Sequence, residues 1–318
     1  MTYAIDPELL PWLDMLPAVT LTDHEALLSA RSSMAQLAEV LPACEPAQPL
    51  DVRDTAVPGP SDAPDVPVRV YAPANRTAAA PGLLYIHGGG FVMGDLDTFD
   101  AHLLRLVDEL GIVIVSVDYR LAPEHPFPAP VEDCYAALAW VAAKAGELGI
   151  DPARLGVAGE SAGGGLAAAV ALLARDRGGP ELSFQYLGIP ELDDRLATPS
   201  MRAYTDTPVW NRPNAIFSWT SYLGAEPGGA DVSPYAAPSR ATDLAGLPPA
   251  FVTTCQFDPL RDEGIDYAQR LAHAGVPVDL RLYPGTFHGS SLVETAAVSR
   301  RMFADELDAL RRGLGIES

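Results

Sequence analysis

From about residue 50 onward, short apolar runs rich in β-branched residues alternate with segments whose apolar residues recur at helical spacing. Apart from the first two, which alternate apolar and polar residues, the runs are continuously apolar, as expected of strands that are covered on both faces. Strands are predicted at 50–57, 66–72, 82–87, 112–118, 154–159, 184–189, 250–255 and 278–283, and helices at 98–110, 130–147, 162–175, 261–274 and 294–312. This alternation predicts an α/β fold with an eight-stranded, mostly parallel sheet and helices on both faces.

The first two strands are the exception to the parallel pattern. The link between them, VPGPSDAPD, is too short to contain a crossover helix. Because only antiparallel strands can be joined by so short a connection, this pair is predicted to be antiparallel and to lie at an edge of the sheet.

Two segments do not fit the alternation and are interpreted as a helical cap. Residues 1–45 have an amphipathic, helical texture, and residues 190–249 far exceed the usual connection of about 2 to 6 residues. The chain is therefore divided into an N-terminal part of the cap (1–45), a first core section (46–190), a cap insertion (191–235) and a second core section (236–318).

The cap segments are rich in aromatic residues. Trp12, Trp210, Phe217 and Trp219 are the candidates for contact with a substrate. The alternative is that these side chains only hold the cap together, and the sequence leaves both open.

Composition restricts the partners of the chain. Asp and Glu number 42 against 21 Lys and Arg, so the net charge is −21. That charge repels nucleic acid and anionic membrane surfaces. The N-terminal residues lack the charged and apolar regions of a signal peptide, and no apolar stretch reaches the roughly 18 residues of a membrane span. Three widely spaced cysteines fit a reducing compartment, so we expect a cytoplasmic protein.

The strongest catalytic signal is GESAGG at 159–164, between a predicted strand and an Ala-rich helix. This is the context of a G-x-S-x-G nucleophile elbow, in which glycines flank a serine on a strained turn. Ser161 is thus predicted to be a nucleophile, and Glu160 is expected to fix the elbow. The alternative is that Gly and Ser are merely common in such a turn.

A second glycine motif, HGGG at 87–90, follows the third predicted strand. Such a loop supplies backbone N–H groups about 3 Å from the oxyanion of an acyl-transfer intermediate. Gly89, Gly90 and Ala162 are assigned to this oxyanion hole, and His87 is expected to brace the loop. A phosphate-binding loop is disfavoured because no GK[ST] or GxGxxG follows.

A serine nucleophile needs a base and an orienting acid, which follow it in chain order in this kind of site. Of the downstream histidines, His273 lies inside a predicted helix, whereas His288 follows the last strand in YPGTFHG and is the predicted base. Asp258, directly after the seventh strand, is the predicted acid. A helix N-cap is the alternative role for Asp258. Asp262 and Glu263 are expected to be ordinary acidic residues of the helix's first turn.

No metal or cofactor is expected. His24, His102 and His125 are scattered, without HExxH or another paired ligand spacing.

Taken together, HGGGF, DYRLAPEHPFPAP, GESAGG, DPLRDEG and FHG resemble the motifs of the hormone-sensitive-lipase-like family of α/β-hydrolases, over about residues 50–310. The resemblance implies a serine carboxylesterase for short- to medium-chain acyl esters, with a cap from the N-terminus and the insertion after the sixth strand, and a possible homodimer. An amidase or deacetylase would use the same triad. A non-catalytic small-molecule receptor on this fold is disfavoured because His288 is present.

Overall fold

The computed structural model describes residues 3–14, 20–40 and 44–317, and its centre is one eight-stranded sheet in the order β1-β2-β4-β3-β5-β6-β7-β8. The strands are β1 (Leu50–Val57), β2 (Val66–Pro73), β3 (Ala80–Ile86), β4 (Val113–Val117), β5 (Ile150–Glu160), β6 (Phe184–Gly188), β7 (Ala250–Phe257) and β8 (Val278–Phe287). Each predicted strand is present, and the predicted α/β fold is confirmed.

The pairing of the strands is mixed. β1 pairs antiparallel with β2, as predicted, and β2 is also antiparallel to β4. All remaining neighbours are parallel. The carboxyl ends of β3 and β5 to β8 therefore meet at one edge of the sheet, which is where loops of open α/β sheets carry their functional groups.

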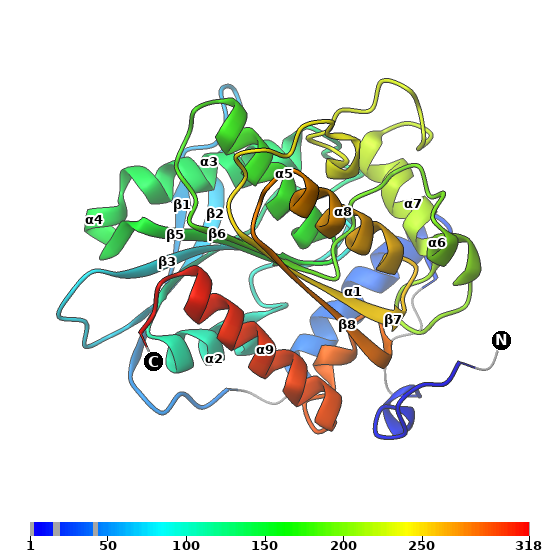
Figure 1. Cartoon of the computed structure of the whole chain (residues 1–318), viewed down its shortest axis with the longest axis horizontal. Coiled ribbons are helices and arrows are strands. Elements are labelled where there is room, and N and C mark those ends of the chain that lie inside the picture. Colours follow the sequence, from blue (N-terminus) through cyan, green and yellow to red (C-terminus); the bar gives the residue numbers. More distant parts are fainter. Residues whose placement is uncertain (1–2, 15–19, 41–43, 318) are drawn as a thin grey trace.

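Helices cover both faces of the sheet (Figure 1). α2 (Asp100–Leu110) and α9 (Ala297–Gly313) lie on one face, and α3 (Ala129–Ala143), α5 (Ala162–Asp176) and α8 (Arg261–His273) lie on the other. The helix predicted at 130–147 is interrupted at Lys144, after which the short α4 (Ala145–Leu148) begins. The apolar periodicity runs through this break, so the pattern of the sequence did not show it.

The segments outside the alternation contain helices of 3 to 17 residues. The N-terminal segment holds η1 (Leu10–Trp12) and α1 (His24–Val40), and the long connection after β6 holds α6 (Pro199–Ala203), α7 (Arg212–Leu223) and η2 (Pro238–Arg240). The two segments touch, since the backbone N–H of Leu21 donates to Asn214 Oδ1 on α7 at 2.9 Å. Parts of the predicted 1–45 section, namely 1–2, 15–19 and 41–43, lie outside the described residues.

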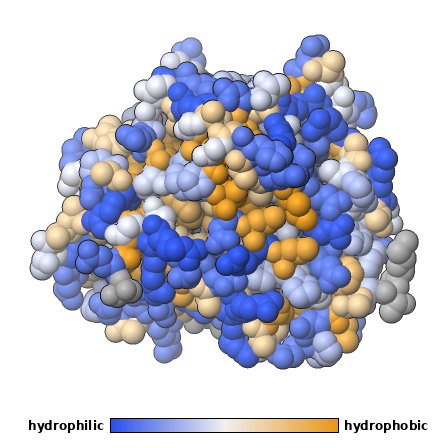
Figure 2. All heavy atoms as spheres, in the orientation of Figure 1, coloured by the Kyte–Doolittle hydropathy of each residue, from blue (hydrophilic) through white to orange (hydrophobic). Residues whose placement is uncertain are grey.

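The surface is mainly hydrophilic on the face seen in Figure 2, with apolar residues gathered toward its middle. No helix in the described part of the chain is both long and apolar enough to cross a bilayer.

A short 3-10 helix, η3 (Ser290–Leu292), links β8 to the last helix, α9.

Candidate active site

Ser161 stands on a sharp turn between β5 and α5. Its backbone has φ 58° and ψ −122°, a strained combination for a residue with a side chain. The turn is possible because α5 approaches β3 closely: a Cβ on Gly163 would lie 2.0 Å from the carbonyl oxygen of Ile86. Only glycine fits there. The local sequence thus forces the predicted elbow geometry, and Ser161 sits at its tip, 7% exposed.

His288 joins Ser161 to Asp258. His288 Nε2 lies 2.9 Å from Ser161 Oγ, and His288 Nδ1 lies 2.7 Å from Asp258 Oδ2. The three residues follow β5, β8 and β7, whose carboxyl ends lie at the same edge of the sheet. All three are buried. This is the arrangement in which the imidazole takes the hydroxyl proton and the carboxylate stabilises the resulting imidazolium.

Asp258 also supports the turn that leads into α8. Its Oδ1 accepts the N–H of Leu260 at 2.9 Å, while Oδ2 faces His288. The N-cap position of α8 is Leu260, whose side chain makes no capping hydrogen bond. The N-cap alternative for Asp258 is therefore wrong, because the helix begins two residues later than an N-cap at Asp258 would require.

Glu263 differs from its expected role. It lies in the first turn of α8 but is 1% exposed, and its Oε1 accepts the N–H groups of Leu192 (2.6 Å) and Asp193 (3.2 Å) in the loop after β6. Burial raises the pKa of Glu263 well above its usual value. Asp262 is also engaged, since it accepts the N–H of Ser200 at 2.7 Å. The two acids hold the start of the long connection against α8.

The glycine loop lies directly against the nucleophile. A Cβ on Gly88 would lie 2.9 Å from the Glu160 carbonyl oxygen and 3.4 Å from Ser161 Cβ. Gly89 has φ +124°, a conformation that residues with side chains rarely adopt. Its carbonyl accepts the N–H groups of Val92 (3.1 Å) and Met93 (3.0 Å), which fix the loop.

Three N–H groups of this region make no hydrogen bond to another backbone group among the described residues. Within the described residues, the amides of Gly89 and Gly90 have no protein acceptor. Ala162 is the first residue of α5, where an N–H has no partner inside the helix. The sequence assigned these same three amides to the oxyanion hole.

His87 braces the glycine loop rather than reacting. Its Nδ1 lies 2.8 Å from the Gly88 carbonyl oxygen, and its ring stacks on Tyr119 with centroids 4.3 Å apart. Burial lowers the pKa of His87 to about 4, so the ring is neutral near pH 7. A neutral, stacked ring is a fixed support, as the sequence suggested.

Next to the elbow lies a group of buried and partly buried titratable side chains that the sequence did not connect. Glu160 packs on Gly188, and burial together with the nearby Glu306 raises the pKa of Glu160. His102 Nε2 lies 3.1 Å from Glu306 Oε1. His102 and Glu306 lie on α2 and α9, 204 positions apart, so no local pattern could pair them.

In the described ranges, no three His, Cys, Asp or Glu side chains form a metal site.

Trp210 is the aromatic residue of the long connection that reaches the catalytic groups. Its Cη2 lies 2.4 Å from where a Cβ on Gly90 would be, so the ring packs on the glycine loop. Its ring centroid is 6.0 Å from that of His288. Trp210 is 4% exposed.

The other predicted aromatic residues pack elsewhere. Trp219 is fully buried on α7, with its ring centroid 5.3 Å from that of Phe91. Phe217 is partly buried against the same core, and Trp12 packs beside a smaller cluster that contains Ile189. Their contacts are those of packing residues.

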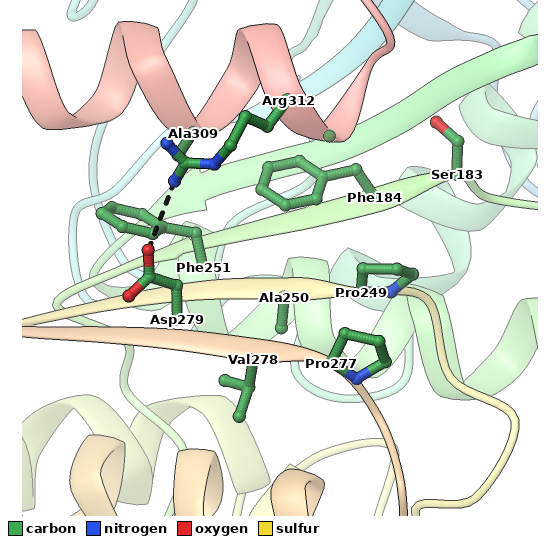
Figure 3. Close-up of a pocket in the computed structure, with 11 residues that line it drawn as sticks. Ser183, Phe184, Pro249, Ala250, Phe251, Pro277, Val278, Asp279, Ala309 and Arg312 are labelled. Carbon is green, nitrogen blue, oxygen red and sulfur yellow. Dashed lines mark hydrogen bonds and ion pairs between the residues drawn. The ribbon is translucent and has the colours of Figure 1, made fainter.

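A hollow of about 330 Å³ opens away from the triad, at the amino ends of β6, β7 and β8 (Figure 3). Phe184 and Phe251 line it, and the ion pair of Arg312 with Asp279, 3.2 Å apart, closes one side. None of the triad residues lines this hollow, so it is separate from the chemistry described above.

Comparisons with known proteins agree with this geometry. A family profile described as the alpha/beta hydrolase fold matches residues 83–292. Carboxylesterase NlhH of Mycobacterium tuberculosis is 43% identical over 293 residues, which cover 90% of this chain and 88% of that protein.

Among solved structures, a bacterial heroin esterase is 51% identical, with a TM-score of 0.93 and 98% of each chain covered. Esterase LipW from Mycobacterium marinum is 38% identical, with a TM-score of 0.87 and coverage of 98% of this chain and 96% of that one. With its Ser161, His288 and Asp258 triad in place, this chain belongs to the hormone-sensitive-lipase-like family of α/β-hydrolases and is a carboxylesterase.

Proposed function

We propose that this carboxylesterase hydrolyses short- to medium-chain acyl esters and favours those of aromatic alcohols. The observation that carries the proposal is the position of Trp210, whose buried ring lies against Gly90 and beside His288. An aromatic ring there offers an apolar wall and a stacking surface to an ester held at Ser161. The names of two relatives support parts of the proposal: an arylesterase of Saccharolobus solfataricus, 39% identical, supports aromatic esters, and an ethyl acetate hydrolase of Pseudomonas putida, 34% identical, supports short acyl groups.

The reaction proceeds through an acyl-enzyme. Ser161 Oγ attacks the ester carbonyl carbon while His288 Nε2 takes the hydroxyl proton, and Asp258 stabilises the imidazolium. The carbonyl oxygen becomes an oxyanion. The C–O bond to the alcohol then breaks, and His288 returns the proton to the leaving oxygen. A water, activated by the same imidazole, attacks the acyl-enzyme and releases the acid.

We assign the oxyanion to the N–H groups of Gly89, Gly90 and Ala162. The absence of protein acceptors for the two glycine amides in the described residues supports this assignment. Donors fixed before the reaction need no reorganisation, and one such donor is worth roughly 3 to 4 kcal/mol in the transition state.

We further propose that residues 1–45 and 191–235 form a cap over the two core sections 46–190 and 236–318. The Leu21 to Asn214 hydrogen bond between the two segments supports this division. Within the cap, Trp210 is the substrate contact that the geometry favours, and Trp12, Phe217 and Trp219 shape the cap around it.

A series of p-nitrophenyl esters of increasing acyl length tests the proposal. Each CH₂ that enters an apolar pocket contributes about 0.8 kcal/mol, so kcat/KM should rise roughly fourfold per carbon until the closed end of the pocket is met, and then fall. Trp210→Ala should move or flatten the maximum. Trp140→Ala, which removes a similar ring from α3, is the matched control. A preference for emulsified long-chain triglycerides would contradict the proposal.

Amide hydrolysis is a second candidate because arylacetamide deacetylases of Oryctolagus cuniculus and Bos taurus are 34% and 33% identical. The same triad serves both acyl groups. An acetanilide assayed beside the matching phenyl acetate separates the two, and we expect the ester to be the far better substrate.

Homodimerisation is a further proposal. β8 ends the sheet, and Leu282 on it is 47% exposed. Light scattering after size-exclusion chromatography should give twice the 33.7 kDa chain mass.

For the compartment, we propose the cytoplasm. Cys44, Cys134 and Cys255 are all unbridged, which fits a reducing environment. Fractionation of the source cells tests this.

A further inference from the structure

A second buried carboxyl group lies behind the nucleophile and takes no part in the triad. Glu191, in the loop after β6, has no exposed surface. Its backbone N–H donates to the Ser161 carbonyl oxygen at 3.0 Å. Its Oε1 lies 3.3 Å from Ser218 Oγ on α7, and Oε2 has no partner among the described residues. A fully buried carboxyl with so few partners calls for an explanation, because its burial is costly.

Ser218 connects Glu191 to the glycine loop. Ser218 is fully buried, and its Oγ donates to the carbonyl oxygen of Gly90 at 2.7 Å. A hydroxyl has one hydrogen to donate, and the shorter of its two contacts is the one to Gly90. Ser218 Oγ is then free to accept a hydrogen from a neutral Glu191.

The surroundings keep Glu191 neutral. Burial, with a contribution from the nearby Asp258, raises the pKa of Glu191 to about 8. The other titratable groups that sense it are Glu263 of α8 and Tyr119. No basic side chain is among these neighbours in the described part of the chain. Near pH 7 the carboxyl therefore carries a hydrogen that can be donated toward Ser218.

We propose that Glu191 is a positioning residue for the oxyanion hole: through Ser218 it holds the Gly90 carbonyl, in the peptide unit that directly follows the two assigned glycine amides, and so restrains the loop that carries them. The proposal rests on the assignment of Gly89 and Gly90 to the oxyanion hole. With Glu191 protonated, the carboxyl donates to Ser218 Oγ, and Ser218 donates its own hydrogen to the Gly90 carbonyl. The Glu191 N–H adds a direct link to Ser161, so one residue connects the nucleophile turn with the glycine loop.

Ionisation of Glu191 would reverse the direction of the hydrogen bond between Glu191 and Ser218. A carboxylate at Glu191 and the carbonyl of Gly90 would then compete for the single hydroxyl hydrogen of Ser218. Hydrogen bonds to charged acceptors are the stronger ones, so the hydroxyl would turn toward Glu191 and release Gly90. The new negative charge would also lie behind the loop that must stabilise an oxyanion. Ser218 therefore holds the Gly90 carbonyl at a pH below the pKa of Glu191 and releases it at a pH above that pKa.

The test compares kcat and KM of four variants on p-nitrophenyl acetate, normalised to the fraction of Ser161 labelled by an organophosphonate. Ser218→Ala and Glu191→Leu should each lower kcat about tenfold, with KM changed less than about twofold. Glu191→Gln should recover most of that loss because its amide still donates to Ser218. Ser239→Ala, another buried serine whose hydroxyl has no partner in the described residues, should keep the wild-type kcat.

The pH dependence gives a readout that a purely structural role would not change. Wild-type kcat should fall above a pH of about 8, and this fall should be absent in Glu191→Gln, which cannot ionise. The same alkaline fall in Glu191→Gln, or an unchanged kcat in Glu191→Leu, would overturn the proposal. If Glu191→Leu does not fold, the comparison of wild type with Glu191→Gln decides. A wild type that labels at Ser161 but cleaves no ester would instead refute the proposed function.

Discussion

Replacing Asp258 by Asn should reduce kcat by about 10⁴, for a reason that the contacts of both carboxylate oxygens specify. The Leu260 N–H already requires an acceptor at the Oδ1 position, 2.9 Å away. The carbonyl oxygen of the new amide side chain will take that position, which places its NH₂ group 2.7 Å from His288 Nδ1. A donor there forces the imidazole to carry its proton on Nε2, facing Ser161 Oγ. The base is then in the wrong tautomer to accept the serine proton.

A loss of about 10⁴ corresponds to about 5 kcal/mol of transition-state stabilisation. Steady-state assays on p-nitrophenyl acetate measure it, and Asp262→Asn is the matched control. Asp262 is close in the chain and also accepts a backbone N–H, that of Ser200 at 2.7 Å, but it does not contact His288. Its variant should lose stability while kcat changes little. Equal losses of kcat in both variants, or a loss below about a hundredfold in Asp258→Asn, would refute the tautomer argument.

Three further predictions concern the elbow and its support. Ser161→Ala should lower ester turnover by about 10⁶ and abolish phosphonate labelling, and near-wild-type turnover would contradict the assigned nucleophile. Gly163→Ala should yield little folded enzyme, because its Cβ would lie 2.0 Å from the Ile86 carbonyl oxygen, and a normal melting curve would show that this contact relaxes easily. The pKa of His87 is lowered from 6.5 to about 4, so between these two values the unfolded chain binds a proton that the folded one does not. The free energy of unfolding, measured by urea titration, should therefore fall by roughly 3 kcal/mol as the pH falls through this range. In His87→Phe the free energy of unfolding should depend less on pH.

The triad was predictable because each of its residues stands directly after a strand. The order of the strands along the chain and the glycines of the elbow restrict where such residues lie, and parallel strands bring their carboxyl ends to one edge. Asp258 and His288 needed only the correct ends of β7 and β8, and the sequence placed these within a few residues.

The buried carboxyl groups were not predictable in the same way. Glu263 looked like a helix-dipole residue because first-turn acids usually are. Its real partners, the N–H groups of Leu192 and Asp193, are 71 and 70 positions away and belong to a loop with no periodic pattern. The pairing of His102 with Glu306 has the same origin. Such contacts depend on how helices and loops that are distant in the chain pack together, and a single sequence carries no local signal for them.

The cap and the catalytic groups are linked by more than proximity. Ser218 and Trp210, both from the long connection, contact the two sides of Gly90: one binds its carbonyl and the other packs where its side chain would be. If the proposed cap and oxyanion hole are correct, a change in the cap that reshapes the substrate pocket will also move a glycine that we assign to the oxyanion hole. For an enzyme of this construction, substrate range and turnover are coupled, and cap variants selected for a new ester should show altered kcat as well as altered KM. The distance that Gly90 can move without loss of turnover then limits how much the sequence of the cap can change while hydrolysis is retained.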